Sequence, residues 1–100
     1  MNPFQIFLFR GDTKKITASL SIDGQDADLT GYSVKMFNAK EKTVIATAMI
    51  DGALATFDIN KGLSAALPPR PTAVMIVFES NVQRVSQPGV LYVSDGVVNV

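Results

Sequence analysis

Apolar and polar residues alternate along most of this chain, as they do in β-strands that bury one face only. Range 13–23 shows the pattern best, because every second residue from Ile16 to Ile22 is apolar. Runs rich in Val, Ile and Thr, separated by turn signals, predict seven strands at residues 4–10, 13–23, 32–39, 43–50, 53–59, 72–79 and 84–94. Seven strands in 100 residues predict an immunoglobulin-like antiparallel β-sandwich that forms a single domain over residues 1–100.

Two of these strands are apolar on both faces. In strand 4–10, Phe7 and Phe9 lie on the face opposite to that of the other apolar residues. Such a strand is either central in its sheet or has one face against a partner molecule. Strand 72–79 is apolar nearly throughout, which predicts a central strand covered on both sides.

Turn signals mark the ends of the strands. Asp23-Gly24 and Asp51-Gly52 predict tight turns. Pro88-Gly89 interrupts the last strand and predicts a bulge or a bend there. Residues 61–67 have the composition of a single helical turn, and the proline-rich segment 68–71 predicts a crossover or an exposed loop.

The amino-acid composition indicates a protein that binds other proteins. Hydrophobic residues make up 47% of the chain, and the mean hydropathy is +0.23. A domain of this size has a small interior, so we expect apolar surface that marks a partner site. Nine Lys and Arg balance nine Asp and Glu, so nothing indicates a nucleic-acid or membrane partner. A surface of zero net charge resists self-association poorly, and we expect a homo-oligomer.

The chain contains no Cys and no His. It therefore lacks a thiolate nucleophile, the commonest general base and the commonest metal ligand, which excludes Ser-His-Asp and Cys-His catalysis. The only glutamates, Glu41 and Glu79, lie in a predicted turn and at a strand end, and no sequence feature brings either beside an Asp for glycosidase chemistry. We expect no enzymatic activity, no cofactor and no resident metal.

Three short features suggest binding, and each has a simpler interpretation. Arg10-Gly11-Asp12 matches a cell-adhesion tripeptide, but between two strands its glycine is more typical of a bend. The acidic residues of loop 23–28 lack the EF-hand spacing, which favours solvated turn carboxylates over a calcium site between loops. Eight aromatic residues could form a sugar-stacking platform, but Phe in alternating strands is more often core.

Two longer segments resemble a recurrent phage pattern. Segment 9–17 (FRGDTKKIT) and segment 28–34 (DLTGYSV) are similar to the N-terminal domain of upper baseplate proteins and related fibre-anchoring proteins of tailed phages. In that family an "RGDT" corner leads into an alternating strand, "DLTGA-V" leads into the next strand, and a hairpin closes the sandwich. Segments 74–79 and 84–93 would form this hairpin here.

The resemblance implies a virion structural protein of the tail or baseplate, assembled in the host cytoplasm, that docks on other virion structural proteins. The larger relatives continue into helical regions that hold receptor-binding proteins, whereas this sequence stops at Val100. That difference favours a fibre-anchoring adaptor, a capsid decoration protein or a spacer. The alternative of a different class is a carbohydrate- or calcium-dependent adhesion module.

The motif residues themselves are interpreted as fold-specifying: Arg10, Gly11, Asp12, Leu29 and Gly31. Gly11 allows a sharp corner, the Asp12 carboxylate can accept backbone N–H bonds, Leu29 packs its loop on the core, and Gly31 permits a left-handed step. The candidate interface residues lie in the first strand and near the C-terminus: Phe7, Phe9, Val97, Val98 and Val100. The alternative for these five is ordinary core.

Overall fold

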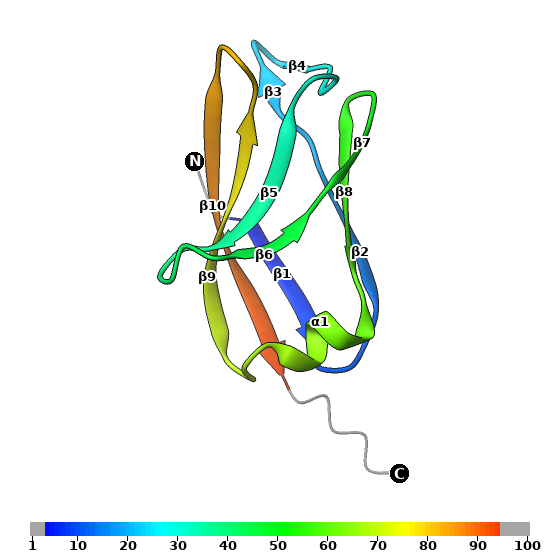
Figure 1. Ribbon diagram of the computed structural model, residues 1–100, viewed down its shortest axis with the longest axis vertical. Coiled ribbons are helices and arrows are strands. Elements are labelled where there is room, and N and C mark those ends of the chain that lie inside the picture. Colours follow the sequence, from blue (N-terminus) through cyan, green and yellow to red (C-terminus); the bar gives the residue numbers. More distant parts are fainter. Residues whose placement is uncertain (1–3, 95–100) are drawn as a thin grey trace.

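Two β-sheets lie face to face in the computed structural model, which describes residues 4–94 (Figure 1). The five-stranded sheet has the order β1 (Phe4–Phe9), β10 (Arg84–Ser94), β9 (Pro71–Glu79), β5 (Ser33–Asn38) and β6 (Val44–Thr47). The three-stranded sheet has the order β2 (Lys14–Ala18), β8 (Leu54–Ile59) and β7 (Met49–Asp51). A small ribbon is formed by β3 (Ser21–Ile22) and β4 (Gln25–Asp26), and helix α1 (Lys61–Ala66) follows β8.

Each of the seven predicted ranges contains a strand, and the neighbouring strands are antiparallel with one exception. β1 runs parallel to β10, with Phe7 opposite Tyr92. The sequence did not predict this, because alternation fixes which side chains share a face and says nothing of strand direction. The closing hairpin of β9 and β10 and the two Asp-Gly turns, between β3 and β4 and between β7 and β8, are present as predicted.

Two predicted strands are divided. Range 43–50 was predicted as one strand, but β6 pairs with β5 in one sheet and β7 pairs with β8 in the other. The chain changes sheets at Ala48, whose N–H donates to the Val34 carbonyl at 2.9 Å. Range 13–23 is likewise divided into β2 and β3. Leu20 between them is buried, whereas Ile22, which alternation placed on the same face, is exposed on the β3–β4 ribbon.

The bulge predicted at Pro88-Gly89 is wrong. β10 is continuous from Arg84 to Ser94, and its register with β9 does not shift. Among the described residues the pairing of β1 with β10 begins at Phe4 and Gly89, and Pro88 itself stays in register with Met75 of β9. Glycine is required at position 89 by packing, because the Phe4 ring occupies the space that a Cβ atom would fill.

The core fills the space between the two sheets. Its largest fully buried side chains come from four strands and one loop: Phe57, Phe78, Leu29, Met36, Ile59 and Leu91. Strands β5, β8, β9 and β10 each contribute every second residue to it, as half-buried strands do.

Helix α1 is joined to the corner between β1 and β2. Asn60 caps the helix by accepting from the Leu63 N–H at 2.8 Å. The fully buried Ser64 hydroxyl accepts from the Gly11 N–H at 3.0 Å and donates to the Asp12 carbonyl at 2.7 Å. Arg10 donates to the Ala65 carbonyl at 2.9 Å. The corner and the helix therefore close the lower end of the sandwich together (Figure 1).

Replacing Ser64 with alanine should lower the free energy of unfolding by about 1–2 kcal/mol, because the Gly11 N–H loses its buried acceptor. Chemical denaturation measures the change. The exposed Ser86 on β10 provides the matched control, and Ser86→Ala should change the stability by less than about 0.5 kcal/mol. Equal effects of the two substitutions would show that the hydroxyl contacts at α1 contribute nothing.

Candidate docking surface

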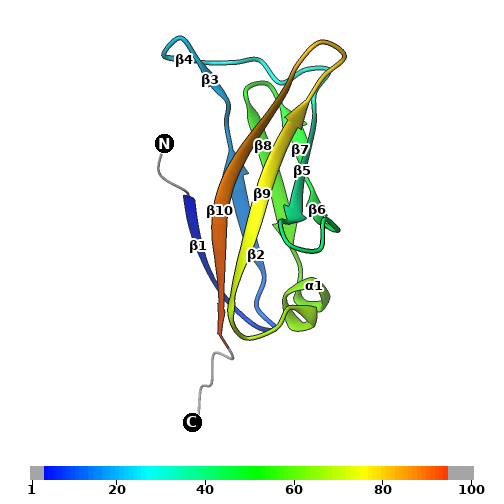
Figure 2. The same ribbon diagram turned by 90° about the vertical axis from the view of Figure 1, so that its left-hand side faces the viewer.

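The outer face of the five-stranded sheet exposes several large apolar side chains, Phe7 and Phe9 among them. Figure 2 shows β1, β10 and β9 in front, with the three-stranded sheet behind them and no further layer over them. The strand register aligns three rows on this face: Phe7–Tyr92–Pro71, Gln5–Val90–Ala73 and Pro88–Met75–Phe37. Only one residue in these rows is polar. The two rows nearer the β9–β10 turn, Lys35–Val77–Ser86 and Ser33–Glu79–Arg84, carry charged and polar side chains, so only the part of the face built by the first three rows is a second apolar side of the sheet.

Two of the predicted interface residues form a ridge along the edge of this face. Phe7 and Phe9 expose 63% and 54% of their surface. The Phe7 ring stacks on Tyr92, with ring centroids 5.0 Å apart and the planes 13° from parallel. We call Phe7, Phe9 and Tyr92 the aromatic ridge. Burial of one aromatic side chain is worth about 1.5–3 kcal/mol, so the ridge offers a partner a substantial apolar free energy.

The structure corrects the interpretation of both doubly apolar strands. β1 is an edge strand of the described sheet and not a central one, and its second apolar face, with Phe7 and Phe9, is exposed. β9 is central, but the described residues cover its outer side in part: Val77 is buried while Ala73 is exposed. Val97, Val98 and Val100 lie outside the described residues.

The free edge of β1 is partly protected. Lys14 donates from Nζ to the Phe7 carbonyl at 3.0 Å, which occupies a backbone acceptor that an added strand would use. Lysines on edge strands commonly prevent such pairing. The face of β1 is therefore better suited to docking than its edge.

Loop 27–32, which holds the second motif segment, is an anchored turn. The Asp28 Oδ1 atom accepts from the Thr30 N–H at 3.0 Å and from the Thr30 hydroxyl at 2.7 Å. These bonds lower the pKa of Asp28 below its ordinary value, the backbone bond having the larger effect. Leu29 is fully buried, and Gly31 has a φ of 88°, the left-handed step that its position predicted.

At Gly11 and Asp12 the first motif segment acts through its backbone. Gly11 has a φ of 87° and forms the corner between β1 and β2. The prediction for Asp12 was that its carboxylate would accept N–H bonds, but within residues 4–94 the main-chain carbonyl is the acceptor instead. Sequence reasoning missed Ser64, which receives this corner, because nothing in the segment 61–67 marks one serine as buried.

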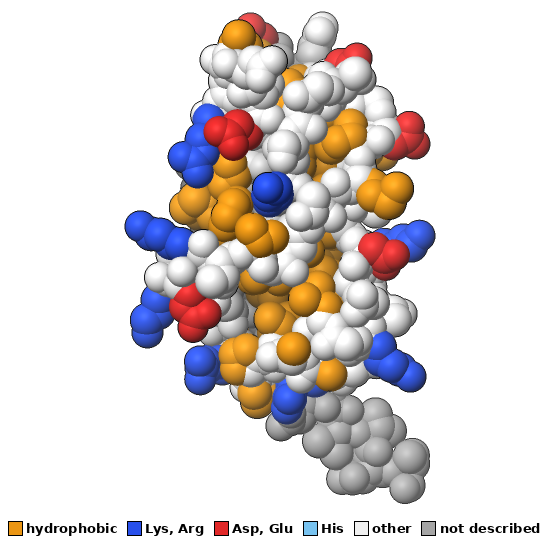
Figure 3. Space-filling view, viewed as in Figure 1, with side chains coloured by type: hydrophobic (Ala, Val, Ile, Leu, Met, Phe, Trp, Pro, Cys, Tyr) orange, Lys and Arg blue, Asp and Glu red, His pale blue; other side chains and the backbone are white. Residues whose placement is uncertain are grey.

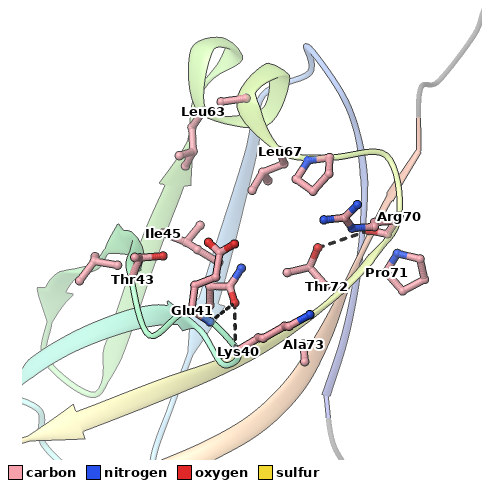
Figure 4. Close-up of a pocket in the computed structure, with 14 residues that line it drawn as sticks. Lys40, Glu41, Thr43, Ile45, Leu63, Leu67, Arg70, Pro71, Thr72 and Ala73 are labelled. Carbon is pink, nitrogen blue, oxygen red and sulfur yellow. Dashed lines mark hydrogen bonds between the residues drawn. The ribbon is translucent and has the colours of Figure 1, made fainter.

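Two hollows open on the surface. A groove of about 630 Å³ lies between α1, the β5–β6 turn and the start of β9, and we call it the basal groove. Figure 4 shows Leu63 and Leu67 on one side of it and Glu41 and Arg70 pointing into it, so its charges are mixed. A smaller hollow of about 240 Å³, the sheet hollow, lies on the outer face of β5 and β9, where Phe37, Met75 and Val77 line it.

Within residues 4–94 no three acidic side chains gather as a metal site requires, and Asp23, Asp26 and Asp28 are each exposed on or beside the β3–β4 ribbon. In the same range, no helix has the length and apolar character needed to cross a bilayer.

Comparison with known proteins identifies the fold. No protein-family model matches the chain, and no curated protein matches its sequence. A chimeric titin Z1Z2 carrying a KLER peptide from decorin is similar in structure, with a TM-score of 0.60 and 13% identity over 92% of this chain and 89% of that one. A chain of the ZIG-8–RIG-5 IG1–IG1 heterodimer has a TM-score of 0.57 and 5% identity over 92% and 82%.

Both similar structures are built from immunoglobulin-type domains. The chain therefore has the immunoglobulin-like β-sandwich fold that its strand pattern predicted. At these sequence identities the likeness concerns the fold alone, and a fold of this kind carries many functions.

Proposed function

We propose that this protein is a non-catalytic structural module of a tailed-phage virion. It docks through the outer face of its five-stranded sheet on other virion structural proteins and on copies of itself. The observation that carries the docking role is the exposure of Phe7 and Phe9 beside the apolar rows of this sheet face. Large exposed apolar patches on small domains are typical of protein interaction sites.

The virion assignment is supported by the two motif segments. Their residues build the corner at Gly11 and the anchored loop around Leu29, so the resemblance lies in positions that determine this fold. The pairing of two immunoglobulin-type domains in the ZIG-8–RIG-5 heterodimer gives a precedent, by analogy of fold, for docking between such domains. Tail, baseplate and fibre-anchoring positions in the particle all suit a docking module of this size.

Virion proteomics tests the proposal. Particles purified by density gradient from cells that express the chain from its phage genome should contain it in a fixed ratio to the tail proteins. A genome carrying Phe7→Ser and Phe9→Ser should give particles that have lost the protein, because a partner would no longer bury the ridge. The matched control is Val82→Ser, which alters a 93% exposed residue in the β9–β10 turn and should leave incorporation unchanged. Absence of the wild-type chain from purified particles would contradict the virion role.

A further inference from the structure

The β3–β4 ribbon carries charge of one sign. Between Ile16 and Val34 the chain has three acidic residues, Asp23, Asp26 and Asp28, and no Lys or Arg. All three are exposed, and Ile22 at the tip exposes 41% of its surface among them. The ribbon lies at the same end of the sandwich as the β9–β10 turn and extends to the side of it in Figure 2, and acidic side chains are visible at that end in Figure 3. We call residues 21–28 the acidic ribbon.

The sheet hollow has the opposite character. Its floor is apolar, and its charged lining residues are Lys42 and Arg84, with no acidic residue among them. Lys35 and Glu79 lie in a small extension of the same hollow beside Arg84, so the surroundings remain cationic by two charges. A cavity of about 150 Å³ lined by aliphatic and aromatic side chains accommodates a benzene ring, so the floor can receive one isoleucine side chain.

Within one molecule, the acidic ribbon points away from the sheet hollow. The hollow lies beside the β5–β6 turn on the outer side of the sheet, whereas the ribbon lies at the end of the sandwich, beside the β9–β10 turn (Figure 1). An acidic finger with an apolar tip and a cationic hollow with an apolar floor are complementary in charge and in chemistry. The occupant that the molecule itself offers for the hollow is thus the ribbon of another copy.

We propose that the acidic ribbon of one copy docks in the sheet hollow of the next copy, with Ile22 on the apolar floor and the ribbon carboxylates facing Lys42 and Arg84. The inference rests on the proposed docking role of this sheet face and names a second copy as one partner. Because the two contact surfaces differ, the contact is heterologous, and repeated copies close into a ring or extend as a filament. Each molecule donates one ribbon and accepts one.

Complementary variants test this contact in a background of Phe7→Ser and Phe9→Ser, which removes association through the ridge. The ribbon variant is Ile22→Ser with Asp26→Asn, and it leaves the Asp28 turn intact. The hollow variant is Lys42→Asn with Arg84→Gln, which places no like charge opposite Glu79. The matched control makes the same changes at the basal groove, Lys40→Asn with Arg70→Gln.

Sedimentation velocity should show that the background protein and the control associate, and that the ribbon and hollow variants each bind their own kind at least about tenfold more weakly. Mixed one to one, the two variants should form a dimer and nothing larger, because only one intact ribbon and one intact hollow remain. The dimer should dissociate as the ionic strength rises from about 0.05 to about 0.5 M.

Three results would overturn the inference: a monomeric background protein, a mixture that does not dimerise, or an equal loss in the control. Loss of association on removal of residues 95–100, with the ribbon variant unaffected, would assign the hollow to that segment and would also overturn it. If the background protein is monomeric while the wild-type protein associates, the ridge remains the docking surface and the proposed function stands. Circular dichroism of each variant verifies that it is folded.

Discussion

Replacement of Leu29 by alanine is expected to lower the free energy of unfolding by about 2–5 kcal/mol. Leu29 lies in a loop, yet it is fully buried among core residues. Its N–H donates to the Gly52 carbonyl at 2.8 Å and its carbonyl accepts from the Tyr32 N–H at 2.9 Å, so the backbone holds the side chain in place. A fixed backbone leaves the loop little freedom to collapse into the cavity.

Leu54→Ala provides the control for this prediction, because Leu54 lies on β8 with 48% of its surface exposed. It should cost less than about 1 kcal/mol in urea denaturation. Domains of this size have a total stability of about 5–15 kcal/mol, so the loss at Leu29 is a large fraction of it. Similar losses at the two positions would mean that the motif leucine has no special part in the fold.

Replacement of Gly89 by alanine should cost about 2–4 kcal/mol, the sum of overpacking and partial loss of Phe4 burial. A Cβ at position 89 would overlap the Phe4 ring, which lies over the glycine in the neighbouring strand. Both the ring and the backbone of Phe4, the first residue of β1, would have to move. Thermal or chemical denaturation gives the change in stability.

A double-mutant cycle identifies the cause. In a Phe4→Ala background the ring is absent, so Gly89→Ala should cost less than it does in the wild-type protein, and the difference is the coupling of the two residues. Gly62→Ala is the matched glycine control, because its nearest contact is an ordinary 3.6 Å to Asn60 and helical alanine is preferred by about 0.5–1 kcal/mol. A cost at Gly89 that does not change with Phe4 removed would contradict the packing described.

The strands and turns were predictable because their signals are local. Alternation over five or more residues and the Asp-Gly pairs fix strand positions from a few neighbours. Sheet membership was not predictable in this way. The crossing of the chain at Ala48, the parallel pairing of β1 and the unbroken β10 at Pro88 all depend on which strand lies alongside, and these partners are far apart in the sequence.

The docking face was predictable in part. Two apolar faces in one strand identified Phe7 and Phe9, and the same reasoning applied to Tyr92 and Met75 would have added them, since each alternates with buried neighbours. The sheet hollow could not be predicted, because it is lined from β5, from the turn after it, from β9 and from β10. Only the folded sheet brings Lys42 and Arg84 to one opening.

Light scattering during size-exclusion chromatography tests most directly the claim that the exposed sheet face is a docking surface. Measured up to about 1 mM, it detects association free energies as small as about 4 kcal/mol. The mass of the wild-type protein should rise above the monomer value of 10.7 kDa with concentration, and Phe7→Ser with Phe9→Ser should reduce that rise. A wild-type mass of 10.7 kDa at every concentration, or a rise that the two substitutions leave unchanged, would contradict the claim.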